Sequence, residues 1–172
     1  MSPEVIQLRD RIESFQFDEP GAALPFASRL AREQGWDHSY AGRVVSEYLR
    51  FILLAMDAGH PVTPSEQVDQ AWHLHLIYTR SYWENLCRDT LGKNLHHGPT
   101  AGGSREDAKF VDWYRKTLES YQRIFSESAP ADIWPAPAAR FADAGAGRWI
   151  DSTNCWIIPR PRCTRLSFWK LL

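Results

Sequence analysis

The segment spanning residues 63–76 reads TPSEQVDQAWHLHL, and it contains the clearest helix start in the chain. Thr63 is a favourable capping residue, Pro64 suits the first helical position, and Glu66 stands where a capping box places its glutamate. Apolar residues continue from there to Leu91, and the glycine that follows is a typical helix stop. The sequence therefore predicts one continuous helix from this start to Leu91.

Three further helices are expected upstream of this segment. A serine cap followed by proline begins a helix over residues 2–15, in which apolar residues recur at helical spacing. A short amphipathic helix is expected over residues 25–35. A longer helix starts at Asp37 or Ser39 and ends at Gly59, and its broad apolar face predicts a central position in the fold.

Downstream, a loop rich in His, Pro and Gly occupies residues 93–103. A fifth helix is expected from Ser104, with apolar residues at helical spacing as far as Phe125. With five helices and no convincing strand pattern, the fold class we predict is all-α, a compact helical bundle.

The composition changes at Ser128, where Pro, Ala, Gly and scattered Trp replace the helical periodicity. Proline at this density excludes long helices. We interpret residues 129–172 as an irregular arm whose Trp and Phe rings anchor it on a bundle formed by residues 1–128, within one domain. A short hairpin is conceivable over residues 149–158.

Composition and charge make some classes of function unexpected for this chain. The 172 residues fit one domain, and a formal net charge of −1 makes nucleic-acid binding unexpected. The N-terminus does not resemble a signal peptide, and no stretch approaches the ~18 to 20 apolar residues of a membrane span. Three cysteines without a C-x-x-C pair indicate reduced thiols. We therefore expect a cytoplasmic protein, and the sequence does not predict its oligomeric state.

Chemistry-bearing residues concentrate between Asp69 and Pro99. Asp69 and His73 lie four residues apart on the expected helix and share a face, so the carboxylate can orient the imidazole or act as a base. His73 and His75 are two residues apart, and their directions differ by about 200°. They cannot bind one ion together from a regular helix, so one of them has another role.

Cys87 and the loop histidines offer further ligands. On a straight helix Cys87 lies about 21 Å from His73, too far to share an ion whose ligands sit at ~2.0 to 2.3 Å. The loop can bring His96 or His97 back either to His73 or His75, or to Cys87. Two metal sites are thus conceivable, and each is short of ligands. Groups on or flanking the expected helix over residues 37–59 could complete the first: His38, Glu47, Tyr48 and His60. Imidazole ligands suit Zn, Cu and Fe alike.

The segment PSEQVDQAWHLHL, together with Tyr82, Cys87 and the sequence HHGP at residues 96–99, resembles the glycine-rich domain-containing protein-like family. The resemblance extends over residues 24–141. It implies a small helical domain of poorly defined activity, and its motif covers Asp69, Trp72, His73, His75, Cys87, His96 and His97. This chain departs from the family name because it has only 10 glycines and no glycine-rich tail.

Three hypotheses follow for the function. The first is a metal-binding protein, conceivably a metal-dependent enzyme, with ligands among His73, His75, His96, His97 and Cys87 and with Asp69 as a catalytic residue. The second is a module that binds a protein or peptide partner through its many aromatic rings. The third assigns the histidines a structural role. Nucleophilic catalysis by Cys87 is disfavoured, because a cysteine near a helix C-terminus has its thiolate destabilised by the helix dipole.

Overall fold

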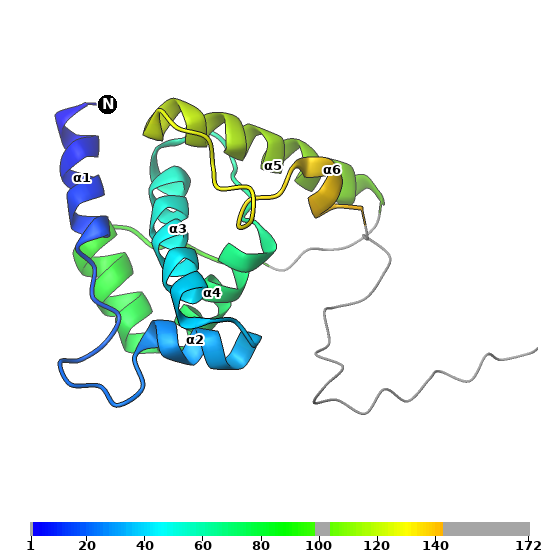
Figure 1. The fold of residues 1–172 in the computed structure, drawn as a ribbon. Coiled ribbons are helices and arrows are strands. Elements are labelled where there is room, and N and C mark those ends of the chain that lie inside the picture. Colours follow the sequence, from blue (N-terminus) through cyan, green and yellow to red (C-terminus); the bar gives the residue numbers. More distant parts are fainter. Residues whose placement is uncertain (1, 99–103, 143–172) are drawn as a thin grey trace, which may run out of the picture.

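A computed structural model describes residues 2–98 and 104–142, with only the backbone for residues 104–107. These residues form seven helices and contain no strand, which confirms the prediction of an all-α fold (Figure 1). None of the helices in this part of the chain is both long and apolar enough to cross a membrane. The helices are α1 (Pro3–Glu13), α2 (Phe26–Gln34), α3 (His38–Asp57), α4 (Glu66–Ile77), η1 (Ser81–Leu91), α5 (Ser104–Phe125) and α6 (Pro137–Arg140).

The caps of the first three helices agree with the sequence prediction. The side chain of Ser2 accepts a hydrogen bond from the first turn of α1, and Asp37 does the same for α3. Gly35 ends α2 in the left-handed conformation with φ of 68°, which glycine adopts without strain. Local capping therefore accounts for the starts of α1 and α3 and for the end of α2.

Helix α3 is the centre of the fold. It packs against α1, α2, α4 and α5, and Figure 1 shows it in the middle of the molecule. Its apolar face is removed from water, which is the main stabilising contribution to such a bundle. The buried residues of α3 are Ala41, Val44, Glu47, Tyr48, Phe51, Ile52, Leu53 and Leu54.

The predicted continuous helix through Leu91 is wrong, because the chain leaves the helical conformation at Tyr78 (φ −82°, ψ 60°). The helix also starts later than expected, with Ser65 as its cap. A straight helix from Glu66 to Leu91 would be roughly 39 Å long and would project out of so small a bundle. The break lets η1, a π-helix, turn back and pack on α1 and α4, which buries its apolar residues.

His75 lies in the core beside this break. Its Nδ1 is 3.0 Å from the Tyr48 hydroxyl of α3, and its Nε2 is 3.1 Å from the Ser81 hydroxyl at the start of η1. Aromatic rings surround the imidazole, among them Phe17 at 4.8 Å and Tyr82 at 5.2 Å between ring centroids. The side chain is fully buried, and this burial lowers the pKa of His75 to about 3. The imidazole is therefore neutral and joins α3, α4 and η1.

The segment after α5 packs on the bundle. Ile133 and Trp134 are buried, and the short helix α6 follows them. This part of the expected arm is anchored by an aromatic ring, as Trp134 stacks at 6.1 Å from Tyr114 of α5. The conceivable hairpin over residues 149–158 lies outside the described residues, and the division at residue 128 stays a prediction.

The buried His75 predicts a specific dependence of stability on pH. Its pKa in the folded protein is below the usual value of 6.5, so its contribution is complete above pH 6.5 and is lost as the pH falls towards 3. The free energy of unfolding should fall by about 1.4 kcal/mol for each pH unit in this range because of this residue alone. Urea unfolding measured between pH 7 and pH 4 should show this slope in the native protein and a shallower one in His75→Gln.

The matched control is His38→Gln, which alters an exposed histidine at the start of α3. It should keep the slope of the native protein. Equal slopes in the native protein and in His75→Gln would contradict a buried neutral imidazole.

Candidate metal centre

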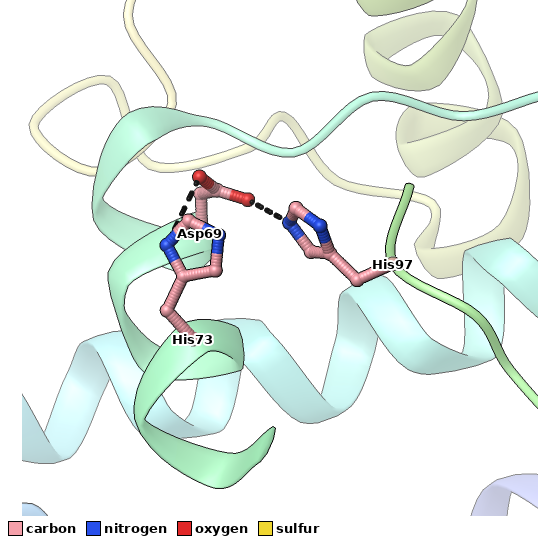
Figure 2. Close-up of side chains that lie close together, drawn as sticks. All are labelled: Asp69, His73 and His97. Atoms are coloured by element: carbon pink, nitrogen blue, oxygen red, sulfur yellow. Dashed lines mark hydrogen bonds and ion pairs between the residues drawn. The ribbon is translucent and has the colours of Figure 1, made fainter. Parts of the chain in front are cut away.

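Two histidines and one aspartate meet at the surface of α4 (Figure 2). Asp69 and His73 come from successive turns of α4, and His97 comes from the segment that follows η1. Asp69 Oδ1 is 2.8 Å from His97 Nε2, and Asp69 Oδ2 is 3.7 Å from His73 Nδ1. One potential ligand atom from each residue lies within 4.8 Å of the others. The expected pairing of Asp69 with His73 on one helix face is therefore present, and His97 joins it.

The three side chains differ in their access to solvent. The side chain of His73 is 51% exposed, whereas those of Asp69 and His97 are 25% and 20% exposed. The rings of His73 and His97 are 4.5 Å apart between centroids. The cluster thus has one open side and one side held against the protein.

A chain of contacts through the core brings His97 back to α4. Trp72 packs edge-on against the His97 ring at 4.4 Å, and its indole N–H donates to the Tyr82 hydroxyl at 2.9 Å. That hydroxyl in turn donates to the backbone carbonyl of Leu95, two residues before His97. Trp72 and Tyr82 are among the residues that carry the family resemblance, but only their tertiary contacts reveal that they position His97.

The other candidate ligands lie elsewhere. His75 is in the core, and the exposed His96 lies beside the Trp83 ring at 5.6 Å. Cys87 is fully buried in the core, and this burial raises the pKa of its thiol. The structure does not bring these three residues to the Asp69 cluster, and within residues 2–98 and 104–142 that cluster is the one group with metal-ligand spacing.

The four groups that could have completed the site have other neighbours. The exposed His38 begins α3, and Tyr48 contacts His75. His60 Nε2 is 2.8 Å from the Ser120 hydroxyl of α5. Glu47, the fourth, belongs to a separate buried network.

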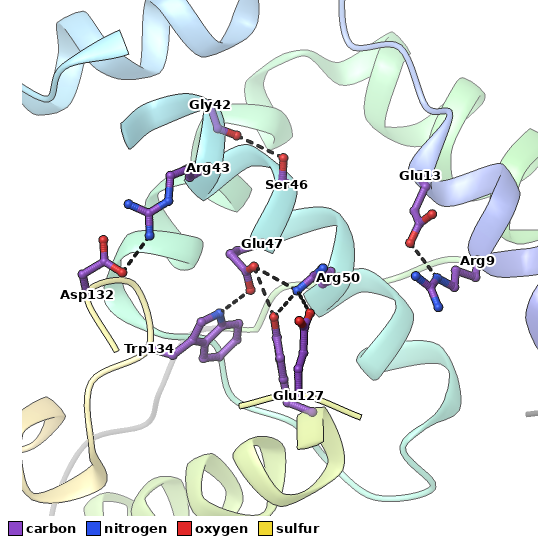
Figure 3. A network of polar contacts seen from close by, with 11 residues as sticks. Arg9, Glu13, Gly42, Arg43, Ser46, Glu47, Arg50, Glu127, Asp132 and Trp134 are labelled. Atoms are coloured by element: carbon purple, nitrogen blue, oxygen red, sulfur yellow. Dashed lines mark hydrogen bonds and ion pairs between the residues drawn. The ribbon is translucent and has the colours of Figure 1, made fainter. Parts of the chain in front are cut away.

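This network fastens the segment after α5 to α3 (Figure 3). The Trp134 indole N–H donates to Glu47 Oε2 at 2.8 Å, and the Tyr121 hydroxyl donates to Oε1 at 3.2 Å. Arg50 lies 3.4 Å from the same carboxylate and forms an ion pair with Glu127 at 2.6 Å. Burial raises the pKa of Glu47, while these donors act in the opposite direction. Glu47 therefore holds the segment after α5 against α3.

A cavity of about 520 Å³ lies beside the cluster and is lined by both Asp69 and His97. Its walls include the rings of Trp72, Phe110, Trp113 and Phe141. They come from α4, α5 and the residue after α6, which are far apart in the sequence. Sequence patterns carry no signal for such a cavity, because it exists only once α5 and α6 pack near α4.

Trp134→Phe tests the network around Glu47. The substitution keeps an aromatic ring but removes the N–H donor from a buried carboxylate, so the free energy of unfolding should fall by about 1 to 3 kcal/mol in urea denaturation. Trp36→Phe is the control, because the Trp36 indole N–H has no hydrogen-bond partner within the described part of the chain. This variant should show a smaller fall in the free energy of unfolding. Equal losses in both variants would contradict a stabilising bond to Glu47.

Comparisons with known proteins place the chain in a family. The model of the UCP032817-like family, which is uncharacterised, matches residues 9–112. This range includes all three residues of the cluster. The glycine-rich domain-containing protein-like family that the motifs suggested is not confirmed by this match. Neither the curated proteins nor the solved structures gave a match. On the extent of its family match, the chain belongs to the UCP032817-like family.

Proposed function

We propose that this domain binds one divalent transition-metal ion through Asp69, His73 and His97. The observation that carries the proposal is the convergence of three potential ligand atoms within 4.8 Å from two separate segments. Two imidazoles and a carboxylate are a common ligand set for such ions.

The separations within the cluster fit this proposal with small adjustments. Atoms that bind one ion at ~2.0 to 2.2 Å lie about 3 Å from one another. The separations of 2.8 and 3.7 Å from Asp69 to the two histidines bracket this value. The His73 side chain is half exposed, so we expect its ring to rotate towards a bound ion with little hindrance. Zinc and iron(II) suit this ligand set best, and copper(II) also accepts imidazole and carboxylate.

The number of ligands bears on what the metal would do. Structural zinc sites are normally closed by four protein ligands, whereas catalytic sites have three and leave a position for water or substrate. The adjacent cavity of about 520 Å³ would give a small molecule access to that position. We therefore propose a metal-dependent activity on a small molecule in preference to a purely structural ion.

The competing interpretation is that the 2.8 Å contact between His97 and Asp69 only fastens the loop to α4. His73 separates the two interpretations, because it is half exposed and contributes little to packing. Removing it should abolish metal binding under the first interpretation and change almost nothing under the second.

The test is metal binding to the untagged chain after chelation and dialysis. Isothermal titration with Zn²⁺, with elemental analysis of the separated complex, should give one ion per chain for the native protein. His73→Ala, His97→Ala and Asp69→Asn should each weaken binding at least about tenfold. Anaerobic titration with Fe²⁺ would compare the two favoured metals.

His96→Ala is the matched control, since it removes the adjacent histidine that faces Trp83. It should bind the ion as the native protein does. Weak binding that responds equally to His96→Ala and His73→Ala would refute the proposed centre.

A further inference from the structure

Two buried polar atoms, each in a residue that lines the cavity beside the cluster, have no hydrogen-bond partner among the described residues. They are the Thr63 hydroxyl oxygen and Arg140 Nε. Thr63 is only 8% exposed, and its backbone N–H is already bonded to the Thr117 side chain at 2.9 Å. Buried polar groups are rarely left unpaired in folded proteins, since each costs about 1 to 3 kcal/mol. A ligand that enters the cavity and reaches either atom would therefore supply a hydrogen-bond partner that the described part of the chain does not.

Charge indicates what kind of ligand fits. Arg140 makes no ion pair with any carboxylate in the described residues, and its guanidinium carbon lies 5.2 Å from the Phe141 ring centroid. Asp69, the one acidic residue in the described lining, already contacts both histidines. A guanidinium recognises a planar carboxylate through two parallel hydrogen bonds. The cavity wall at Arg140 thus favours an organic anion.

The remaining walls of the cavity favour a ligand with a flat, apolar ring. Trp72, Phe110, Trp113 and Phe141 present aromatic rings to the cavity, and its volume of about 520 Å³ falls within the range of small-molecule sites. Aromatic rings bind one another in edge-on and offset arrangements. Lys109 also lines the cavity, and its ammonium lies 4.7 Å from the Trp113 ring centroid. The wall thus carries two cations, and the aromatic lining rather than the number of charges favours an aromatic carboxylate over phosphate.

We propose that this cavity binds an aromatic carboxylate, with the carboxylate on Arg140 and Thr63 and the ring among the four aromatic side chains. The inference deepens the proposed function and rests on it for one point only, that the bound molecule lies beside a metal ion. Binding of the carboxylate itself depends on Arg140 and on the walls.

The test uses phenylacetate and its neutral analogue phenylacetamide with the full chain, freed of metal. Titration calorimetry and tryptophan fluorescence should both report phenylacetate binding, with phenylacetamide at least about tenfold weaker. Arg140→Gln should reduce the affinity for phenylacetate at least about tenfold. Arg32→Gln, the same change at an exposed arginine of α2, should leave it unchanged.

Thr63→Val provides a second variant of nearly equal shape, should Arg140→Gln disturb the short helix α6. It should weaken phenylacetate binding without altering the circular dichroism spectrum. If phenylacetate fails to bind at millimolar concentration, or binds with no response to Arg140→Gln and Thr63→Val, the inference is overturned. If inorganic phosphate competes with equal affinity, the aromatic walls contribute nothing and the proposed ligand class is wrong.

His73→Ala separates this inference from the proposed metal centre, because His73 does not line the cavity. The variant should lose Zn²⁺ binding and retain phenylacetate binding. If only the proposed metal centre is wrong, the native protein should bind no Zn²⁺ and should still bind phenylacetate in a way that depends on Arg140. Phenylacetate binding that requires added Zn²⁺ and ignores Arg140→Gln would overturn the inference and leave the metal centre standing.

Discussion

The neutral imidazole of His75, bonded between Tyr48 and Ser81 inside an aromatic core, is the constraint on which the arrangement of α4 depends. It connects the central helix to both sides of the break after Ile77. With His75 directed into the core, His73 two residues earlier must point away from it. Asp69, one turn before His73, shares that outer face. The position of the candidate metal centre is therefore a consequence of how the core is packed.

The return of the loop to this face depends on a second set of core contacts. Trp72 touches His97 with its ring and bonds Tyr82 with its N–H, and Tyr82 holds the Leu95 carbonyl. Because the Leu95 carbonyl is held in place, the residues directly after it can occupy only a small region. His97 contacts Asp69 there, and His96 lies beside Trp83. The two candidate ligands on α4 and the third from the loop are thus all positioned by contacts within the core, through two separate sets of residues. Such prior positioning lowers the conformational entropy lost when a ligand binds.

The cavity has a separate structural origin. Glu47 and Arg50 of α3 fasten Trp134 and Tyr121, and Asp132 is held by an ion pair with Arg43 at 2.8 Å. The chain then continues into α6, which carries Arg140 beside Phe141. The buried Glu47 therefore holds Trp134 in place and, through the chain that follows, supports the cavity wall that carries Arg140.

The sequence by itself determined the all-α class, the cap at Ser2, and the presence of Asp69 and His73 on one helix face, and it narrowed the cap of α3 to Asp37 or Ser39. It also showed that His73 and His75 could not act together. These properties depend on residues within about four positions of one another, so local propensity and helix geometry are sufficient. Only the tertiary structure decided which of the two histidines is buried, where the helix breaks, and that His97 rather than His96 reaches Asp69. These outcomes depend on packing between segments that the sequence separates by tens of residues, and no local pattern encodes which long-range contact buries the most apolar surface.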